Sequence, residues 1–235
     1  MKWAKHGKEH RAKRPAEIKY YVISLGNRMK NVVNICKTVN ADIINAIDGI
    51  DERGIDKSIK KHGIRYVNLL KKTGDLGAYL SHLEALYTII TKRDGISVIL
   101  EDDIKLDKDH RRNLQTMLNE IAGKKWDILM LSILPQFGTW PRIPITNNVC
   151  HYYGSLGTAA YCVNGSTSAQ KVYDILRIKF ESVIDVAIKT NHKKINIFSA
   201  KNPIMNGDIQ SGVSFGPPNK YQRKLADYYV GKIWI

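Results

Sequence analysis

Residues 95–109 read Gly-Ile-Ser-Val-Ile-Leu-Glu-Asp-Asp-Ile-Lys-Leu-Asp-Lys-Asp. The apolar, β-branched run at residues 96–100 predicts a buried strand, and three acids, Glu101, Asp102 and Asp103, follow it directly. Adjacent carboxylates repel one another, which favours protonation of one of them unless a cation is bound. Hard divalent cations such as Mg²⁺ and Mn²⁺ prefer oxygen ligands, so the cluster predicts a metal site. The two-residue period of a strand places Glu101 and Asp103 on one side. The alternative is that the acids form a solvated turn at the end of the sheet.

The length and composition are typical of a soluble globular protein. Its 235 residues suit one large domain or two small ones. No apolar run approaches the roughly 18 residues that a membrane-spanning helix needs. The three cysteines are far apart in the sequence and show neither zinc spacing nor a disulfide framework, so we expect a reducing compartment, the cytoplasm.

A net charge of +15 indicates a polyanionic partner. Such a surplus attracts nucleic acid, anionic lipid or phosphorylated substrates alike. The charge makes a basic nucleic-acid-binding module without catalysis the alternative hypothesis, although the sequence contains no zinc finger, RRM-type aromatic motif or P-loop. Residues 1–17 are basic and aperiodic and predict a flexible arm, or simply a solvated tail. We expect peripheral membrane association through this arm or through the basic, aromatic tail at residues 217–235.

The start of the predicted domain has the pattern of a nucleotide-binding α/β unit. A strand at residues 20–25 is followed by a short break and a helix at residues 28–39. Ligands of such units lie beyond the carboxyl ends of the strands, where Arg28 suits a base or phosphate, although it is equally typical of a protein surface. No Gly-x-Gly-x-x-Gly motif supports a dinucleotide fold of the usual type. The inward face of the helix is predicted to consist of Met29, Val32, Val33 and Cys36.

Further helices and strands alternate along the chain. The apolar spacing of residues 73–90 predicts a helix with Asp75 as its N-cap and with Ser81 and His82 near its start. His82 is either packed and structural or directed at a ligand. Asp185 stands among apolar residues, where a lone acid is either a helix cap or a working carboxylate. The segment around Asp208 is irregular. Other helices are predicted at residues 108–121 and 166–179, and other strands at residues 126–132 and 195–199.

Six short motifs together resemble one known family. They are Ile-Ser-Leu-Gly-Asn-Arg at 23–28, Ala-Ile-Asp-Gly at 46–49, Gly-Asp-Leu-Gly-Ala-Tyr-Leu-Ser-His at 74–82, Val-Ile-Leu-Glu-Asp-Asp at 98–103, Gly-Thr-Ala-Ala-Tyr at 157–161 and Val-Ile-Asp at 183–185. In this order and spacing, over residues 18–216, the chain resembles glycosyltransferase family 25. That family includes lipooligosaccharide β-galactosyltransferases and collagen hydroxylysine galactosyltransferases. The chain departs from the family pattern at Ala78, where cysteine is usual, and at Ser24, where asparagine is usual.

The resemblance implies a GT-A-like fold, which is a Rossmann-like α/β/α sandwich with a mixed central sheet. It also implies a metal-dependent, inverting transfer of a hexose, galactose or glucose, from a UDP-sugar to a glycan, glycolipid or glycoprotein, as in lipopolysaccharide biosynthesis. Mn²⁺ or Mg²⁺ would be held by Asp103 and Glu101, and Asp185, or in second place Asp208, would be the general base. The implied donor-binding residues are Ser24, Leu25, Arg28, Asp48, Gly77, Ser81, His82, Glu101 and Asp102. A retained fold without activity is a third hypothesis.

Overall fold

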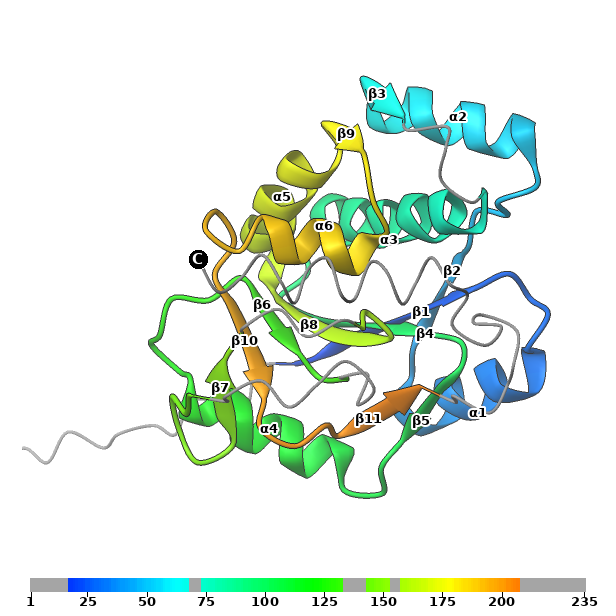
Figure 1. Ribbon diagram of the computed structural model, residues 1–235. Coiled ribbons are helices and arrows are strands. Elements are labelled where there is room, and N and C mark those ends of the chain that lie inside the picture. Colours follow the sequence, from blue (N-terminus) through cyan, green and yellow to red (C-terminus); the bar gives the residue numbers. More distant parts are fainter. Residues whose placement is uncertain (1–16, 68–72, 133–142, 153–156, 208–235) are drawn as a thin grey trace, which may run out of the picture.

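A mixed seven-stranded sheet forms the centre of the computed structural model (Figure 1), which describes residues 17–67, 73–132, 143–152 and 157–207. The strand order is β2-β1-β4-β8-β6-β10-β7. Its strands are β1 (Lys19–Ser24), β2 (Asp42–Asn45), β4 (Ile96–Glu101), β6 (Ile128–Met130), β7 (Val149–His151), β8 (Ala160–Asn164) and β10 (Ile197–Ala200). Two small sheets pair β3 (Tyr66–Val67) with β9 (Lys179–Phe180) and β5 (Ile104–Leu106) with β11 (Met205–Gly207).

Helices cover both faces of the sheet, as the sequence predicts for an α/β/α sandwich. They are α1 (Met29–Val39), α2 (Glu52–His62), α3 (Thr73–Lys92), α4 (His110–Glu120), α5 (Gly165–Leu176) and α6 (Ile184–Thr190). Figure 1 shows α3, α5 and α6 above the sheet, α1 and α4 below it, and α2 stacked outside α3. None of the helices in the described ranges is both long and apolar enough to cross a bilayer.

The strand directions bring several loops to one edge of the sheet. Strand β1 is parallel to both β2 and β4, so the carboxyl ends of all three point the same way. Strand β8 runs antiparallel to β4, so its beginning lies at this same edge. The chain runs from β1 outward to β2 and returns to β4 on the other side of β1. This reversal is a topological switch point, where α/β sheets bind their ligands.

The core lies in two layers, one on each face of the sheet. The upper layer packs α3 against the sheet through Tyr79, Leu80 and Leu83, and the lower layer packs α1 and α4 against it through residues such as Val32 and Leu114. Alternate residues of the central strands reach opposite layers, so Ile99 joins the upper layer whereas Val98 and Leu100 join the lower one. The near-continuous apolar run of β4 is therefore explained by burial on both faces.

Two local predictions are wrong. Helix α3 begins at Thr73, so Asp75 lies inside the first turn, where a carboxylate favours the positive end of the helix dipole, and it is not the N-cap. Helix α1 is rotated relative to the prediction. Its buried residues are Val32, Ile35 and Val39, a stripe with spacings of three and four. Met29 and Val33 instead face outward, where their side chains are 51% and 39% exposed.

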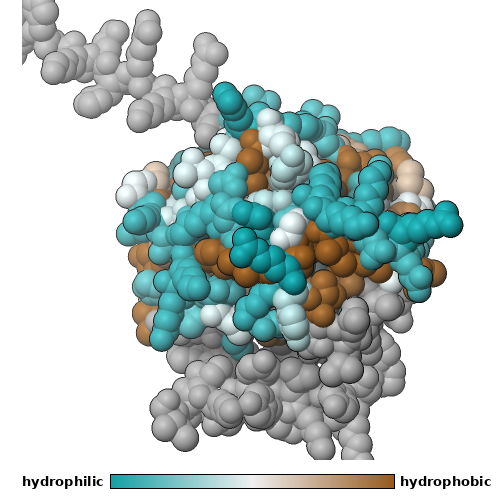
Figure 2. Space-filling view, turned by 90° about the horizontal axis from the view of Figure 1, so that it is seen from above, coloured by the Kyte–Doolittle hydropathy of each residue, from teal (hydrophilic) through white to brown (hydrophobic). Residues whose placement is uncertain are grey.

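Figure 2 views the molecule from above and shows the side on which α2 lies. Hydrophilic side chains cover most of this face, and an apolar band crosses it. Exposed apolar side chains on this side include Tyr66, which belongs to β3, and Ile178, which lies just before β9. The polar covering is typical of a helix layer whose outer side faces water.

Candidate functional site

A pocket of about 270 Å³ opens at the switch point between β1 and β4. Its walls come from the ends of β1 and β4, the segment after β2 and the start of α3. The predicted donor-binding residues that line it are Ser24, Leu25, Arg28, Asp48, Ser81, His82, Glu101 and Asp102. Residues predicted from four separate motifs therefore meet around one cavity, whose volume is near the lower end of the range for small-molecule sites.

Asp102 holds the floor of this pocket together. Its carboxylate accepts a hydrogen bond from Ser24 Oγ at 2.7 Å and from Arg28 Nη1 at 2.9 Å. The β1–β4 register pairs Ile23 with Glu101, which places Ser24 beside Asp102. Both carboxylate oxygens are thus used inside the protein, so Asp102 fixes the position of the Arg28 guanidinium and ties α1 to β4.

Asp103 differs from Asp102 in having an oxygen without a protein partner. Its Oδ2 lies 3.4 Å from Arg28 Nη1, whereas Oδ1 is buried and accepts no hydrogen bond. Burial, together with the neighbouring Glu101 and Asp102 carboxylates, raises the pKa of Asp103 to about 6 against the lowering effect of Arg28. Such a carboxylate is suited to a cation, because a positive charge would satisfy the orphaned oxygen and favour the ionised form.

The described residues contain no group of three His, Cys, Asp or Glu side chains placed to hold a metal ion by themselves. The two carboxylates of Asp103 and Glu101 still fit Mn²⁺ or Mg²⁺ in a nucleotide site, since Mg²⁺ is commonly bound through one or two carboxylates, substrate phosphates and water. The orphaned Oδ1 of Asp103 is the atom best suited as a protein ligand.

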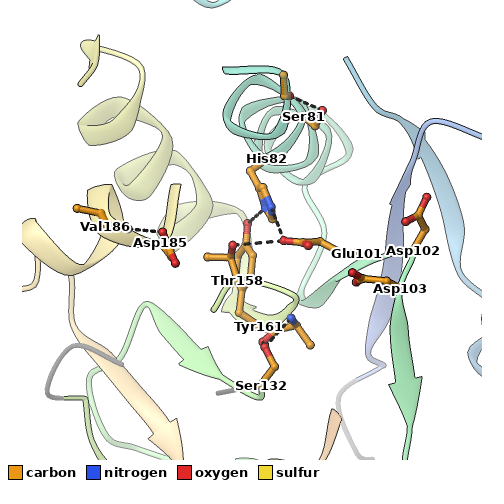
Figure 3. Close-up of polar contacts among 12 residues, drawn as sticks. Ser81, His82, Glu101, Asp102, Asp103, Ser132, Thr158, Tyr161, Asp185 and Val186 are labelled. Carbon is orange, nitrogen blue, oxygen red and sulfur yellow. Dashed lines mark hydrogen bonds and ion pairs between the residues drawn. The ribbon is translucent and has the colours of Figure 1, made fainter. Parts of the chain in front are cut away.

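Glu101 points away from Asp102 and into a buried polar network (Figure 3). Its Oε1 lies 3.3 Å from His82 Nε2 and 3.3 Å from Thr158 Oγ1. His82 is 1% exposed, and its Nδ1 lies 3.0 Å from the Tyr161 hydroxyl, with the two rings stacked. Because both imidazole nitrogens are engaged, His82 orients Glu101 at the pocket wall. The resemblance identified His82, but the pairing with Tyr161 bridges 79 residues and has no sequence signal.

Gly77 and Ser81 join α3 to the segment after β2. A Cβ atom at Gly77 would lie 2.6 Å from the Ile47 carbonyl oxygen and 2.8 Å from the Gly49 nitrogen. Ser81 Oγ accepts a hydrogen bond from Ile47 N at 2.8 Å and donates to Gly77 O at 2.7 Å. Gly77 does not line the pocket itself but allows the backbone contact that forms one of its walls.

Asp48 and Leu25 form part of the exposed rim. Asp48 Oδ1 accepts a hydrogen bond from Ile50 N at 3.1 Å, which closes the turn predicted from Asp48-Gly49. Leu25 is 52% exposed next to the pocket opening. Within the described residues, neither side chain is held by a partner distant in the sequence, so both are available at the entrance.

Asp185 stands at the start of α6, on the other side of Thr158 from the acidic cluster (Figure 3). Its Oδ1 accepts a hydrogen bond from Val186 N at 2.7 Å. Burial and, more weakly, the charge of Glu101 raise the pKa of Asp185 to about 6 despite this backbone hydrogen bond. A half-buried carboxyl group with such a pKa is suited to exchange protons near neutral pH. Asp208 lies outside the described residues.

Asn31 is a contributor that the sequence analysis missed. Its Nδ2 donates to the carbonyl oxygens of Asp102 at 2.6 Å and Ile104 at 3.3 Å. It therefore fixes the backbone of the turn that carries Asp102 and Asp103. Its place three residues after Arg28, on the same side of a helix, was the available signal.

The sequence model of glycosyltransferase family 25, described as an LPS biosynthesis protein, matches residues 17–137. The chain belongs to glycosyltransferase family 25. The matched region contains β1 to β6 and every residue of the pocket, whereas Asp185 lies beyond it. The family match therefore covers the proposed nucleotide side of the site but not the proposed base.

Curated relatives of the chain match it over part of their length. A rat protein named "Probable inactive glycosyltransferase 25 family member 3" is 25% identical over 138 residues, 51% of this chain and 24% of the relative. Procollagen galactosyltransferase 1-B of Xenopus laevis is 37% identical over 60 residues, 25% of this chain and 10% of the relative. Each match therefore spans less than a quarter of the relative's length.

Solved structures similar to this chain include a UDP-glucose pyrophosphorylase complexed with UDP-glucose. It is 12% identical, with a TM-score of 0.48, and the match covers 92% of this chain and 100% of that chain. A UTP-bound UGPase from Acinetobacter baumannii is 10% identical, with a TM-score of 0.44, and the match covers 91% and 99%. Likenesses with TM-scores below 0.5 do not bear on the function of this chain.

Proposed function

We propose that the chain is a metal-dependent, inverting glycosyltransferase that moves a hexose from a UDP-sugar to a hydroxyl group of a glycan, glycolipid or glycoprotein. The observation that carries this proposal is the convergence of Arg28, Glu101 and Asp102 at one pocket on the switch point of the sheet, with Asp103 Oδ2 3.4 Å from Arg28 Nη1. Membership of glycosyltransferase family 25 supports the reaction class. Galactose and glucose are the favoured sugars because of the family resemblance alone.

In the proposed binding mode, UDP occupies the pocket between the ends of β1 and β4. The Arg28 guanidinium, which Asp102 holds at 2.9 Å, faces the diphosphate and offsets its charge. Asp103 is the proposed metal ligand, with Glu101 as a second ligand or as a contact to the donor. Mn²⁺ or Mg²⁺, when bound there, would act as a Lewis acid on the phosphate oxygens of the leaving group.

The network around Glu101 has a positioning role in this proposal. Thr158 and His82 fix the Glu101 side chain from two directions, at 3.3 Å each. A carboxylate held by buried partners loses little further rotamer freedom when a ligand binds, so its contacts are pre-organised. The Tyr161 hydroxyl lies 3.0 Å from His82 Nδ1 and holds the imidazole in place. Tyr161 therefore acts on Glu101 through His82.

Asp185 is the proposed general base, with Asp208 as the second candidate. An inverting transfer needs a base on the side of the sugar opposite to the leaving UDP, within hydrogen-bond reach of the acceptor hydroxyl. Asp185 approaches the acidic cluster from α6, across Thr158, and its raised pKa of about 6 lets it hold the transferred proton.

A donor screen tests the proposal. The full chain is incubated with Mn²⁺ and each common UDP-sugar, and UDP release is measured without acceptor. The expected result is release with one UDP-sugar that stops in EDTA and in Asp103→Asn. Full activity in EDTA would contradict the metal role. The absence of UDP release with every UDP-sugar, together with no change in melting temperature on addition of UDP and Mn²⁺, would contradict the whole proposal. That result would favour the hypothesis of a retained fold without activity.

A further inference from the structure

The outer face of α1 forms an unusual surface beside the pocket. The outer face of α1 consists of Met29, Lys30, Val33, Asn34, Lys37 and Thr38, all of them exposed. Met29 is 51% exposed and Val33 39% exposed, although both are apolar. Side chains four residues apart lie above one another on a helix, so these two form a continuous apolar line. Leu25, four residues before Met29 and 52% exposed, lies just before the start of the helix.

This face is also positively charged. Helix α1 contains Lys30 and Lys37 and no acidic residue. Arg111 of α4 donates a hydrogen bond to the Thr38 carbonyl oxygen, which adds a third cation at the carboxyl end of the helix. Asp42, whose charge acts on Cys36 of α1, is already paired with Lys19 at 3.1 Å and with Lys92 at 2.9 Å. Asp102, at the other end of the helix, is bound by Arg28.

We infer that the outer face of α1 is a docking surface for an anionic lipid bilayer. Exposed aliphatic side chains beside lysines match the chemistry of the bilayer interface, where apolar groups enter below the headgroups and ammonium groups meet the lipid phosphates. A single-stranded nucleic acid would instead favour aromatic side chains for base stacking, and the outer face of α1 contains none. This surface differs from the terminal arm and tail for which the sequence predicted membrane association.

The position of the face gives the docking a consequence for the site. Leu25 lines the pocket, and Arg28 links the start of α1 to the acidic cluster. A bilayer bound along Leu25, Met29 and Val33 would therefore lie beside the pocket opening. An acceptor carried by a lipid would be held within reach of the donor. This consequence rests on the proposed function, whereas the docking itself does not.

Vesicle binding by the full chain tests the docking, with matched variants as controls. Co-sedimentation is measured with phosphatidylcholine vesicles and with vesicles of phosphatidylcholine and phosphatidylglycerol in equal parts. Lys30→Gln/Lys37→Gln is compared with Lys57→Gln/Lys60→Gln, which removes two exposed lysines from α2 and gives the same net charge. Each lysine near an anionic surface strengthens binding roughly fivefold, so the α1 variant should bind the mixed vesicles roughly 30-fold more weakly. The α2 variant should bind at least ten times more tightly than the α1 variant.

A second pair of variants tests the apolar part at constant charge. Met29→Ser/Val33→Ser should weaken binding to the mixed vesicles severalfold, whereas Tyr66→Ser/Ile178→Ser, which removes exposed apolar groups beside the β3–β9 sheet, should leave it unchanged. Thermal unfolding of each variant establishes that it is folded. No UDP-sugar is needed, so failure of the docking and failure of the proposed function are distinguishable.

Three outcomes would overturn the inference. Equal losses in the two lysine variants would show attraction by net charge without a defined surface. No loss in Met29→Ser/Val33→Ser would show that no apolar group enters the bilayer. Binding of an RNA oligonucleotide that depends on Lys30 and Lys37, without any binding of vesicles, would assign the face to nucleic acid.

Discussion

Gly77→Ala should separate α3 from the segment that follows β2. The new Cβ would lie 2.6 Å from Ile47 O, 2.8 Å from Gly49 N and 3.0 Å from Gly49 Cα. All three atoms belong to the backbone, so no side chain can rotate away to relieve the overlap. The hydrogen bond from Ile47 N to Ser81 Oγ, now 2.8 Å, would lengthen as the two segments move apart.

The expected loss of stability follows from two opposing effects. Overpacking of a buried site costs about 1–3 kcal/mol, whereas replacement of glycine by alanine inside a helix gains about 1 kcal/mol. Gly74 provides the matched control, because it lies in the same helix and a Cβ there would meet nothing within 4 Å. Gly74→Ala should be neutral or stabilising, and the two variants should differ by about 2 kcal/mol in the free energy of unfolding.

Urea unfolding of the two glycine variants beside the natural chain measures this difference. A two-kcal/mol gap corresponds to roughly 4–8 °C in melting temperature for a chain of this size. Gly77→Ala should also bind UDP more weakly, since the displaced segment carries one wall of the pocket. A Gly77→Ala protein as stable as Gly74→Ala would refute the assigned contact between α3 and the segment after β2.

The remaining predictions concern ionisable groups. Asp103→Asn should raise the free energy of unfolding of the metal-free protein by about 3 kcal/mol at pH 7, because the pKa of Asp103 is raised from 3.8 to about 6 and its charged form is disfavoured in the fold. This gain should shrink in urea titrations as the pH falls below about 6 and should vanish only well below 3.8, where the carboxyl group is protonated in the folded and unfolded states alike. A loss at pH 7 would contradict the burial argument. Asp185→Asn should slow transfer about 10²-fold or more. In the natural chain the rate should fall about tenfold per pH unit below the Asp185 pKa of about 6, and a flat profile there would exclude Asp185 as the base. Glu84→Gln should cost about 3 kcal/mol at pH 7, since the contact with His62 Nε2, 3.1 Å from Glu84 Oε2, is the largest of the effects that lower the pKa of Glu84 to about 2, followed by Lys61. That stabilisation is present above the unfolded pKa and is lost as pH falls from about 4.5 to 2, so the two proteins should converge in acid.

The sequence predicted most of the strands and helices that pack on the sheet, because their patterns are local, but it predicted neither α6 nor β7. The apolar run before Glu101 and the strand and helix around Arg28 were placed within one or two residues. The inward residues of α5, Ala169, Val172, Tyr173 and Leu176, are all buried as the helical period requires. The buried face of α1 was predicted wrongly because six of the eleven residues of this helix are apolar. Only packing against β1 decides which of them are buried.

Most residues of the pocket were predicted, but their partners were not. The motifs named Ser24, Arg28 and Asp102 without indicating that they bind one another across 74 to 78 residues. That arrangement depends on the β1–β4 register, which no local pattern specifies. The same reason explains why the acidic triplet divides its roles, with Asp102 bound inside the protein and Asp103 left with an open oxygen.

The binding of UDP with and without Mn²⁺ tests the central claim most directly, because it requires neither the correct sugar nor the acceptor. Calorimetric titration of UDP into the full chain should show binding in Mn²⁺, much weaker binding in EDTA, and no Mn²⁺ effect in Asp103→Asn. Arg28→Gln should weaken binding in both conditions, since in the proposed binding mode the guanidinium faces the diphosphate independently of the metal. Equal UDP affinity with Mn²⁺ and with EDTA, or an unchanged Mn²⁺ effect in Asp103→Asn, would contradict the assignment of the acidic cluster to a metal–diphosphate site.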